Sequence, residues 1–124
     1  MLLASVAPAQ EPAKLEREIW LCRGVVQTAP GEPLQPEERR LEFDFTSGDV
    51  VMSAGGARHR ARFQASRVHF EAEFPVTVDG GVQAMESVSL ARSNGRMTAT
   101  ARSADGRQLR LFRSSCRPED VPGQ

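Results

Sequence analysis

Apolar and polar residues alternate along most of this 124-residue chain. In LEFDF, residues 41–45, Leu41, Phe43 and Phe45 fall on one side and two acidic residues on the other. The same period of two runs through RVHFEAEF, residues 67–74. Such alternation is typical of β-strands with one buried face, and no segment shows a convincing helical repeat. Further strands are predicted at 18–26, 49–54, 57–64, 75–78, 82–92, 95–102 and 107–116.

Turn residues separate these strands at short intervals, so we predict an all-β, antiparallel meander of about eight strands that forms a small barrel. A β-sandwich is the alternative. The longest connection is the proline-containing stretch 27–36, and Asp79-Gly80-Gly81 is predicted to form a tight turn or bulge. One domain is expected over residues 17–116. Residues 1–16 and 117–124 are predicted to be disordered tails.

Two turns predict the pairing of the last strands. Asn94-Gly95 favours a two-residue type I′ loop, which places Leu90 opposite Ala99 and Val88 opposite Ala101. Between the last two strands, Ala104-Asp105-Gly106 is predicted to be a three-residue loop with a left-handed Gly106. That loop pairs Ala101 with Leu109 and Ala99 with Leu111, because a two-residue loop would set Arg110 opposite Ala101.

The segment ARHRARF, residues 57–63, raises the question of nucleic-acid binding. A two-residue loop at Ala65-Ser66, or a four-residue loop of the same parity, would pair it with RVHFEAEF and give its arginines partners. The predicted cross-strand pairs are Arg60 with Glu71, Arg58 with Glu73, Arg62 with His69, Phe63 with Val68 and Ala61 with Phe70. Ion pairs of this kind leave little positive charge for phosphates, and interleaved exposed aromatic residues are missing. Nucleic acid is therefore not an expected partner.

The same register places His59 on the apolar face and His69 on the exposed face. The two histidines then share no metal site, and we expect His59 to be a hydrogen-bonded core residue, with pocket lining as the alternative. Paired carboxylates occur at Glu42 with Asp44 and at Glu71 with Glu73, about 7 Å apart, a spacing compatible with two-carboxylate hydrolysis. The better explanation for both pairs is that charged residues occupy every second position on the solvent-exposed face of a strand.

We assign no catalytic, cofactor-binding or metal-binding residue, because no nucleophile, zinc, Walker or dinucleotide motif is present. Gly55-Gly56 follows a strand without opening a helix, so it is a turn and not a phosphate cradle. A hydrolase using Glu71 and Glu73, or His59, is the least favoured function.

Charge is balanced overall but unevenly distributed. Residues 11–50 carry a net charge of −4, residues 51–91 of 0 and residues 92–124 of +4. The basic end contains Arg92, Arg96, Arg102, Arg107, Arg110, Arg113 and Arg117. Closure of a barrel would set these strands beside the acidic ones, so the charges could neutralise each other. The alternative is a cationic side for an acidic partner or a lipid headgroup.

The first residues and the two cysteines predict an exported protein. MLLASVAPAQ has a short apolar run followed by Ala7-Pro8-Ala9, which fits the end of a signal peptide; a plain terminus is the alternative. Cys22 and Cys116 lie 94 residues apart, without CxxC partners. In an oxidising compartment we expect one disulfide joining the first and last strands, against the alternative of two separate thiols. No run of about 18 apolar residues is present, so no transmembrane segment is expected.

Three features of the chain form one frame: Trp20-Leu21-Cys22 in the first strand, a meander, and a closing strand LFRSSC, residues 111–116. This frame resembles small exported bacterial β-barrel proteins, among them the C-type lysozyme inhibitors. The resemblance implies an eight-stranded barrel with a Ser-Gly-x-x-Tyr loop that enters the lysozyme cleft. The nearest stretch here runs from Ser53 to His59. His59 stands in place of the tyrosine, and the chain contains no tyrosine. The family's later loop lysine has no counterpart.

We therefore expect a periplasmic or secreted bacterial protein that acts as a non-catalytic binding module and needs no cofactor. Its expected partner is an unidentified protein, bound through the loop containing Ser53, Gly55, Gly56, Arg58 and His59. The alternative is a small apolar ligand carried in the barrel interior, which an interior void of roughly 300 Å³ or more would favour. A monomer is the working expectation.

Overall fold

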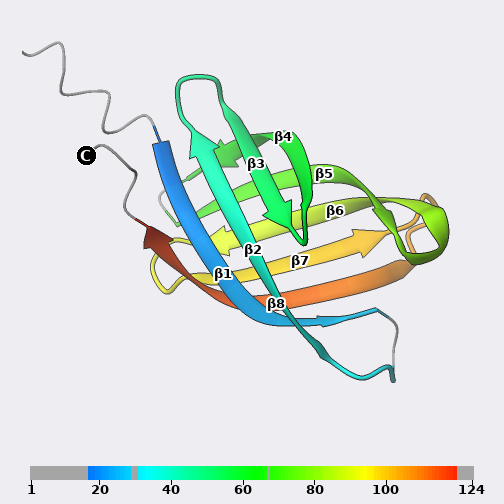
Figure 1. Ribbon diagram of the computed structural model, residues 1–124. Coiled ribbons are helices and arrows are strands. Elements are labelled where there is room, and N and C mark those ends of the chain that lie inside the picture. The colour runs from blue at the N-terminus through cyan, green and yellow to red at the C-terminus, as the bar shows by residue number, and fades with distance from the viewer. Residues whose placement is uncertain (1–16, 29–30, 67, 120–124) are drawn as a thin grey trace, which may run out of the picture.

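The computed structural model describes residues 17–28, 31–66 and 68–119. Eight strands in these residues pair antiparallel with their chain neighbours, and the sheet closes between the first and the last (Figure 1). The strands are β1 (Arg17–Gln27), β2 (Gln35–Asp44), β3 (Asp49–Ala54), β4 (Ala57–Ala65), β5 (His69–Val78), β6 (Val82–Ala91), β7 (Arg96–Arg102) and β8 (Gln108–Glu119). The predicted all-β barrel is confirmed, and the sandwich alternative is wrong.

The predicted alternation produces an apolar core inside the barrel. Phe43 of β2 stacks on Phe70 of β5 with ring centroids 4.0 Å apart, and Phe63 meets Phe43 edge-on at 5.0 Å. Aromatic pairs with these geometries add about 0.5–1.5 kcal/mol each beyond the area they bury. The same core contains Trp20, Val26, Leu41, Val50, Met52, Phe74, Val76, Val88, Leu90, Met97, Ala99, Ala101 and Phe112.

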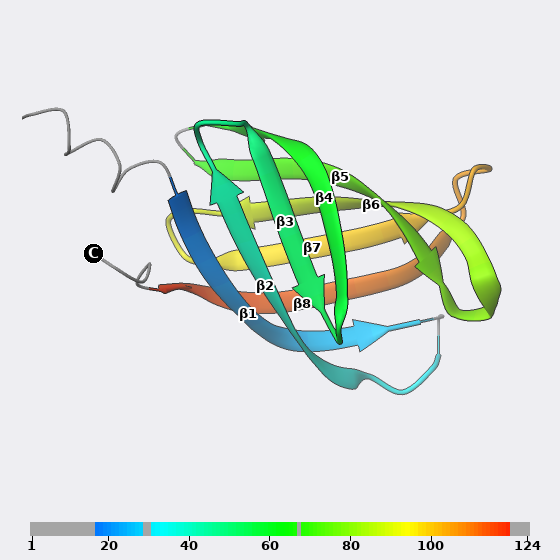
Figure 2. The same ribbon diagram turned by 45° about the horizontal axis from the view of Figure 1, so that its top comes forward.

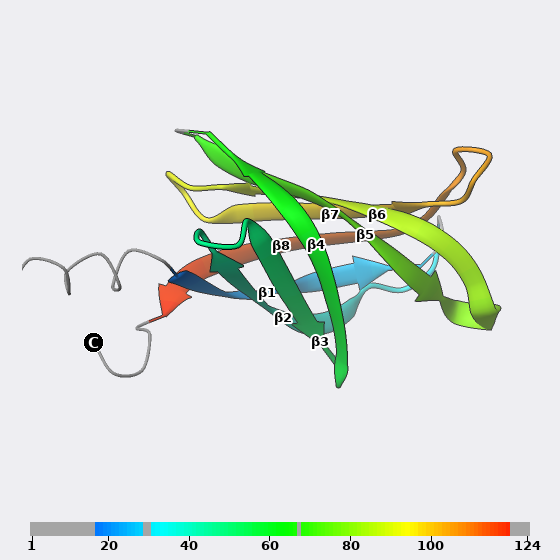
Figure 3. The ribbon, with the colours of Figure 1, turned by 90° about the horizontal axis from the view of Figure 1, so that it is seen from above.

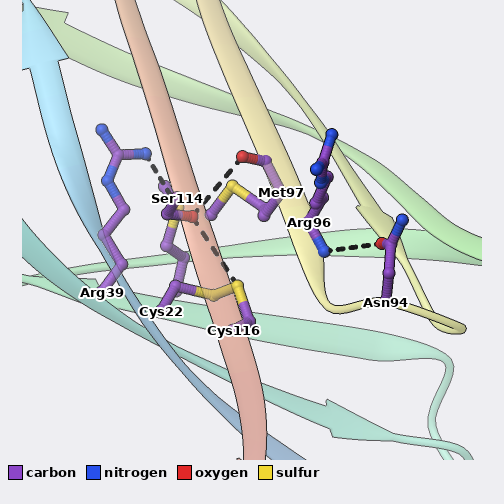
Figure 4. Close-up of a disulfide and its surroundings, with 8 residues drawn as sticks. Cys22, Arg39, Asn94, Arg96, Met97, Ser114 and Cys116 are labelled. Carbon is purple, nitrogen blue, oxygen red and sulfur yellow. Dashed lines mark hydrogen bonds between the residues drawn. A yellow bond between two sulfur atoms is a disulfide. The ribbon is translucent and has the colours of Figure 1, made fainter.

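A disulfide closes the barrel, as predicted. Cys22 and Cys116 face each other in the β1·β8 ladder with Cα atoms 4.0 Å apart, and their sulfur atoms are bonded. Figure 4 shows the bond beside Ser114, whose hydroxyl lies 3.7 Å from Cys116 Sγ and 3.4 Å from the carbonyl oxygen of Met97 on β7. The bond thus lies where three neighbouring strands meet.

Several predicted boundaries are displaced. β2 begins at Gln35, six residues before the predicted LEFDF strand, and β5 joins two predicted strands into one. β8 continues to Glu119, so the predicted tail from 117 is wrong over its first three residues. The predicted tail and signal segment 1–16, and residues 120–124, lie outside the described residues. No described residue belongs to a helix long and apolar enough to cross a membrane.

The predicted pairing of β6 with β7 is wrong by two residues. Leu90 faces Met97, and Val88 faces Ala99, because the turn contains residues 92–95 rather than Asn94-Gly95 alone. Gly95 has a φ of 74°, and its N–H donates to the carbonyl oxygen of Ala91. A Cβ atom on Gly95 would lie 2.1 Å from the carbonyl oxygen of Cys116, so contact with β8 fixes this turn.

The predicted β7–β8 loop is confirmed, but the predicted register beyond it is wrong. Ser103 N–H donates to the carbonyl oxygen of Arg107 across the loop, and Gly106 has a φ of 89°. An irregularity between Ala101 and Arg102 then shifts the pairing by one residue. Ala101 therefore faces Arg110 instead of Leu109, and Ala99 faces Phe112 instead of Leu111. The reason is chemical: Arg110 has an ionic partner inside the barrel, described below.

Candidate functional site

The predicted partner-binding loop forms the tip of the β3–β4 hairpin. Gly55 and Gly56 connect Ala54 to Ala57 and are both exposed, with φ values of 54° and 88°. Ser53 pairs with Arg58, and Met52 pairs with His59. In Figure 2 this hairpin tip lies apart from the β5–β6 turn, and Figure 3 shows it projecting beyond the other strands of the barrel. The loop residues are thus together on one projecting element.

On one side of this hairpin the backbone pairing that closes the barrel is short. β4 pairs with β3 over six residue pairs, and β5 pairs with β6 over ten, but β4 and β5 share only three. These pairs are Phe63 with Ala72, Gln64 with Glu71 and Ala65 with Phe70. Figure 3 shows β4 and β5 running together near their turn and separating toward the β3–β4 hairpin tip. We call this gap between β4 and β5 the open seam.

The predicted ion pairs across this seam are wrong. The β4–β5 register differs by four residues from the predicted one, so Arg60 does not face Glu71 and Arg58 does not face Glu73. Arg60 instead lies 3.2 Å from Asp49 on β3, and Arg62 lies 3.9 Å from the same carboxylate.

The cause of this shift is a turn two residues later than predicted. Ser66, and not Gln64, closes the turn: its N–H donates to the carbonyl oxygen of His69. Its hydroxyl oxygen also accepts hydrogen bonds from the N–H groups of Val68 and His69. The predicted pairings of Arg62 with His69, Phe63 with Val68 and Ala61 with Phe70 are wrong for the same reason.

An open groove of about 860 Å³ follows the seam and the outer face of β5 to β7. Arg60 and Arg62 of β4 line it, as do Glu71 and Glu73 of β5. The acidic side chains contact their own neighbours: Glu71 Oε2 lies 2.9 Å from His69 Nε2, and Glu73 Oε2 accepts a hydrogen bond from the Ser87 hydroxyl at 3.3 Å. The rest of the lining combines the hydroxyl groups of Ser87, Ser89, Thr98 and Thr100 with the apolar side chains of Ala61, Ala72, Pro75 and Val88. The groove therefore has a mixed polar and apolar surface that carries both signs of charge.

The two histidines lie on opposite faces, as predicted. His59 is half-buried opposite Met52, whereas His69 belongs to the outer face and contacts Glu71. The predicted hydrogen bond of His59 is not found among the described residues. Within the same residues no group of three or more histidine, cysteine or acidic side chains could hold a metal ion.

The other carboxylate pair has a structural role. Glu42 lies 2.7 Å from Arg17 and 3.5 Å from Arg40, in two salt bridges. Asp44 Oδ1 accepts hydrogen bonds from the backbone N–H groups of Thr46 and Ser47, so it stabilises the β2–β3 turn. Neither carboxylate is positioned as an acid or base toward a groove.

Four charged side chains form a buried cluster that sequence reasoning missed. Arg39 and Glu86 are 2% and 0% exposed inside the barrel. Arg39 Nη1 lies 2.8 Å from Glu86 Oε1, Arg39 Nε lies 2.6 Å from Glu37 Oε2, and Arg110 Nη2 lies 3.1 Å from Glu86 Oε2. The Arg39 guanidinium also lies 4.2 Å above the Phe112 ring. Two positive and two negative charges therefore balance within the barrel wall.

The sequence did carry a signal for half of this cluster. Arg39 is in phase with Leu41 and Phe43 on β2, and Glu86 is in phase with Val88 and Leu90 on β6. A charged residue at a core position of a strand indicates a buried partner of opposite charge.

The basic C-terminal residues are spread over separate surroundings. Arg92 lies 3.1 Å from Glu18 and 4.4 Å above the Phe70 ring, whereas Arg110 points into the barrel. Arg40 of β2 reaches Glu119 of β8 at 3.6 Å. These salt bridges join the acidic and basic parts of the chain across its closure.

The hairpin, the groove and the buried cluster are the features that bear on function. The chain matches no family model, no curated protein and no solved structure.

Among the described residues, the centre of the apolar core leaves no space for a carried ligand. The space between Leu41, Phe43, Phe70, Phe74 and their neighbours has no volume that a water molecule could occupy. A recess of about 290 Å³ lies at one mouth of the barrel. Its walls are Val26, Thr28, Glu37, Val78, Val82, Leu109 and Arg110.

One carboxyl group has a displaced pKa. The hydrogen bond from the Ser103 hydroxyl lowers the pKa of Asp105 below its ordinary value of 3.8, and the backbone N–H of Arg107 lowers it further. Asp105 lies in the exposed β7–β8 loop, so this shift belongs to turn structure and not to a catalytic site.

Proposed function

We propose that this protein is a non-catalytic protein-binding module of the periplasm or the extracellular space, and that the β3–β4 hairpin from Ser53 to His59 contacts the partner. The observation that carries this proposal is the projecting tip, whose Gly55 and Gly56 are exposed beside an open seam. A projecting element on a rigid barrel is a common place for recognition residues. The filled interior favours surface binding over transport.

The disulfide supports the proposed compartment. Cys22 and Cys116 are joined, and such bonds persist in oxidising compartments and are rare in the cytosol. The first sixteen residues, with their signal-like pattern, agree with export.

Affinity capture followed by a binding titration tests the proposal. Wild-type protein is expected to retain a partner from periplasmic extract, and the purified partner is expected to bind Arg58→Glu roughly tenfold more weakly. Arg107→Glu is the matched control, because Arg107 is an exposed arginine in another turn, β7–β8. Equal weakening by both variants, or no weakening by Arg58→Glu, would contradict a role for the hairpin.

Inhibition of a C-type lysozyme is the specific activity that the sequence resemblance favours. We expect lysozyme turnover to fall as the protein is added, and the His59→Ala variant to restore it in part. Lysozyme turnover that a large excess of the protein leaves unchanged would exclude the inhibitor function and leave the broader binding proposal standing.

A second candidate function is binding of a small apolar ligand at the barrel mouth, favoured by the recess of about 290 Å³. Val26, Val78 and Val82 supply apolar walls, and the charged side chains of the lining, Glu37 and Arg110, belong to the balanced cluster around Glu86. The fluorescence of an anionic apolar dye such as anilinonaphthalene sulfonate tests it: the dye should brighten with wild type and not with Val82→Glu. Equal fluorescence with both proteins would contradict this site.

A further inference from the structure

The β4 edge of the open seam offers unpaired backbone groups. In an antiparallel ladder, alternate residues direct their N–H and C=O groups toward the same neighbour. Phe63 N–H donates to Gly48 on the β3 side, so the odd-numbered residues of β4 bond toward β3. Arg58 and Arg60 then direct their backbone groups toward β5, where no described residue pairs with them, whereas Arg62 lies at the last position of the β4–β5 ladder, beside the Phe63–Ala72 pair.

The β5 edge on the other side of the seam is less able to pair. Arg92 N–H donates to Val68 on the β6 side, so even-numbered residues of β5 bond toward β6 and odd-numbered ones face the seam. Pro75 is one of the residues that face the seam, and proline has no N–H to donate. Continued pairing with β4 would set Pro75 opposite Arg60, whose carbonyl would have no donor. Pro75 therefore keeps the seam open.

We propose that the β4 edge binds an extended segment of a partner protein as an added β-strand, with acidic residues at alternate positions of that segment. This inference rests on the proposed function and specifies its mode of recognition. Unpaired strand edges accept such segments through backbone hydrogen bonds, and side chains at alternate positions provide the specificity. The groove of about 860 Å³ beside the edge leaves space for the added strand.

Charge selects the sequence of the added strand. Arg58, Arg60 and Arg62 all point to the outer face of β4, and the side chains of Arg60 and Arg62 are 65% and 82% exposed. Asp49 contacts Arg60 and Arg62 and offsets one of the three positive charges, so the β4 edge keeps a net positive charge. On the β5 wall of the groove, Glu71 and Glu73 contact His69 and Ser87. Acidic residues directly opposite them would form cross-strand pairs worth about 0.2–1 kcal/mol each. On the inner side, Ala57 and Ala61 are small, so the added strand can carry larger apolar residues there.

A second copy of this chain fits the edge poorly. Pairing of two β4 edges would set the arginines of one copy beside those of the other, and like charges across strands are destabilising. The Pro75-containing β5 edge of a second copy would supply too few donors. A partner of different sequence is therefore the occupant that the edge favours.

Two synthetic peptides test the proposal on the intact, disulfide-bonded protein. One alternates glutamate with valine, and the other carries lysine in place of each glutamate. We expect the glutamate peptide to bind and the lysine peptide to bind at least roughly tenfold more weakly. In wild-type protein, hydrogen exchange followed by NMR should slow at the amides of Arg58 and Arg60 when the glutamate peptide is added. The amides of His59 and Ala61 already bond to β3 and should change little.

A pair of variants at one position separates backbone from charge. Arg60→Pro removes the N–H that faces the seam and leaves the β3 ladder its donors, so peptide affinity should fall roughly tenfold or more. Arg60→Ala keeps the N–H but removes the side-chain charge, together with its contact with Asp49, and should weaken binding about threefold. Unchanged exchange at the two arginine amides, or equal binding of both peptides, would overturn the proposal even if Arg60→Pro failed to fold. Concentration-dependent dimerisation through the same amides would overturn it in favour of self-association.

The outcomes also separate this inference from the function it rests on. If Arg58→Glu weakens capture of the natural partner while Arg60→Pro does not, the hairpin binds the partner without strand addition, and the inference is wrong. If neither variant changes capture, the proposed function is wrong. Loss of capture by both, together with protected amides, supports the two together.

Discussion

The Glu86 carboxylate contacts two arginine side chains, Arg39 and Arg110, inside the barrel. Glu86 on β6 pairs with Ala101 on β7, and Ala101 pairs in turn with Arg110 on β8. Because alanine fills little of the space between them, the Glu86 carboxylate reaches both Arg110 and Arg39, which comes from the opposite wall. A fully buried carboxylate is tolerated only when its charge and lone pairs are satisfied in this way.

Glu86→Gln should lower the free energy of unfolding by about 3–5 kcal/mol, because it leaves buried guanidinium groups without their carboxylate. Chemical denaturation with a shared m-value measures the loss. Glu73→Gln is the matched control on the exposed face of the same sheet, and it should change stability by less than about 0.5 kcal/mol.

A double-mutant cycle with Arg110→Gln tests the pairing itself. The two losses should be less than additive, since removing both charges of one pair costs less than removing each alone. Strict additivity would mean that Arg110 and Glu86 are not coupled in solution.

Sequence reasoning could have found Arg39 and Glu86 from their phase with apolar neighbours, but not Arg110. Its inward direction depends on the irregularity between Ala101 and Arg102. A one-residue shift reverses which side chains face the core, and no local pattern around Arg110 announces it. Its burial is decided by Glu86, a residue on another strand.

At the scale of elements, turn chemistry predicted where the chain reverses better than it predicted which residues pair. The left-handed Gly106 was predicted correctly, and the Gly55-Gly56 turn as well. The predicted registers were wrong where contacts from a third strand decide them: the Cys116 backbone on β8 fixes the turn at Gly95, and the Arg110 side chain contacts Glu86. At the β4–β5 turn the decisive contact is the Ser66 hydroxyl, which a search for glycine-rich turns overlooks.

The β7–β8 turn should show a measurable pH dependence. Asp105 has a lowered pKa in the folded protein, so its carboxylate stabilises the turn above the ordinary pKa of 3.8. As the pH falls through the folded pKa the contribution is lost. NMR titration of the Asp105 carboxyl carbon should give a midpoint below 3.8, and Ser103→Ala should move it upward. An unmoved midpoint would show that the Ser103 hydroxyl does not stabilise the charge.

At the scale of the molecule, the disulfide constrains the unfolded chain more than it adds contacts to the folded one. It links residues 94 positions apart, and Cys22 is fully buried. A loop of this length removes enough unfolded-state entropy to stabilise the protein by about 4–5 kcal/mol. The Cys22→Ser/Cys116→Ser variant should unfold at correspondingly lower denaturant concentration, and Ser114→Ala beside the bond should not. Equal midpoints for wild type and the double variant would contradict this entropic role.

The overall architecture was predictable because it follows from properties repeated in every strand. Period-two burial, short turns and two end-placed cysteines all indicate one closed meander, so an error in any single register leaves the prediction intact. The candidate site was only half predictable. The projecting Gly55-Gly56 tip follows from local sequence, whereas the open seam depends on the β4–β5 register, which ends after three pairs and, if continued, would set Pro75 opposite Arg60.

The barrel is joined along two sides in unequal ways. Nine residue pairs and a covalent bond connect β1 to β8, while three pairs connect β4 to β5. By backbone pairing the molecule thus consists of two four-stranded halves, β1–β4 and β5–β8, which share more ladder pairs on the disulfide side than at the open seam. A strand bound at the open seam would pair with the free edge of one half, and its free energy of binding would add to the free energy of unfolding of the whole barrel.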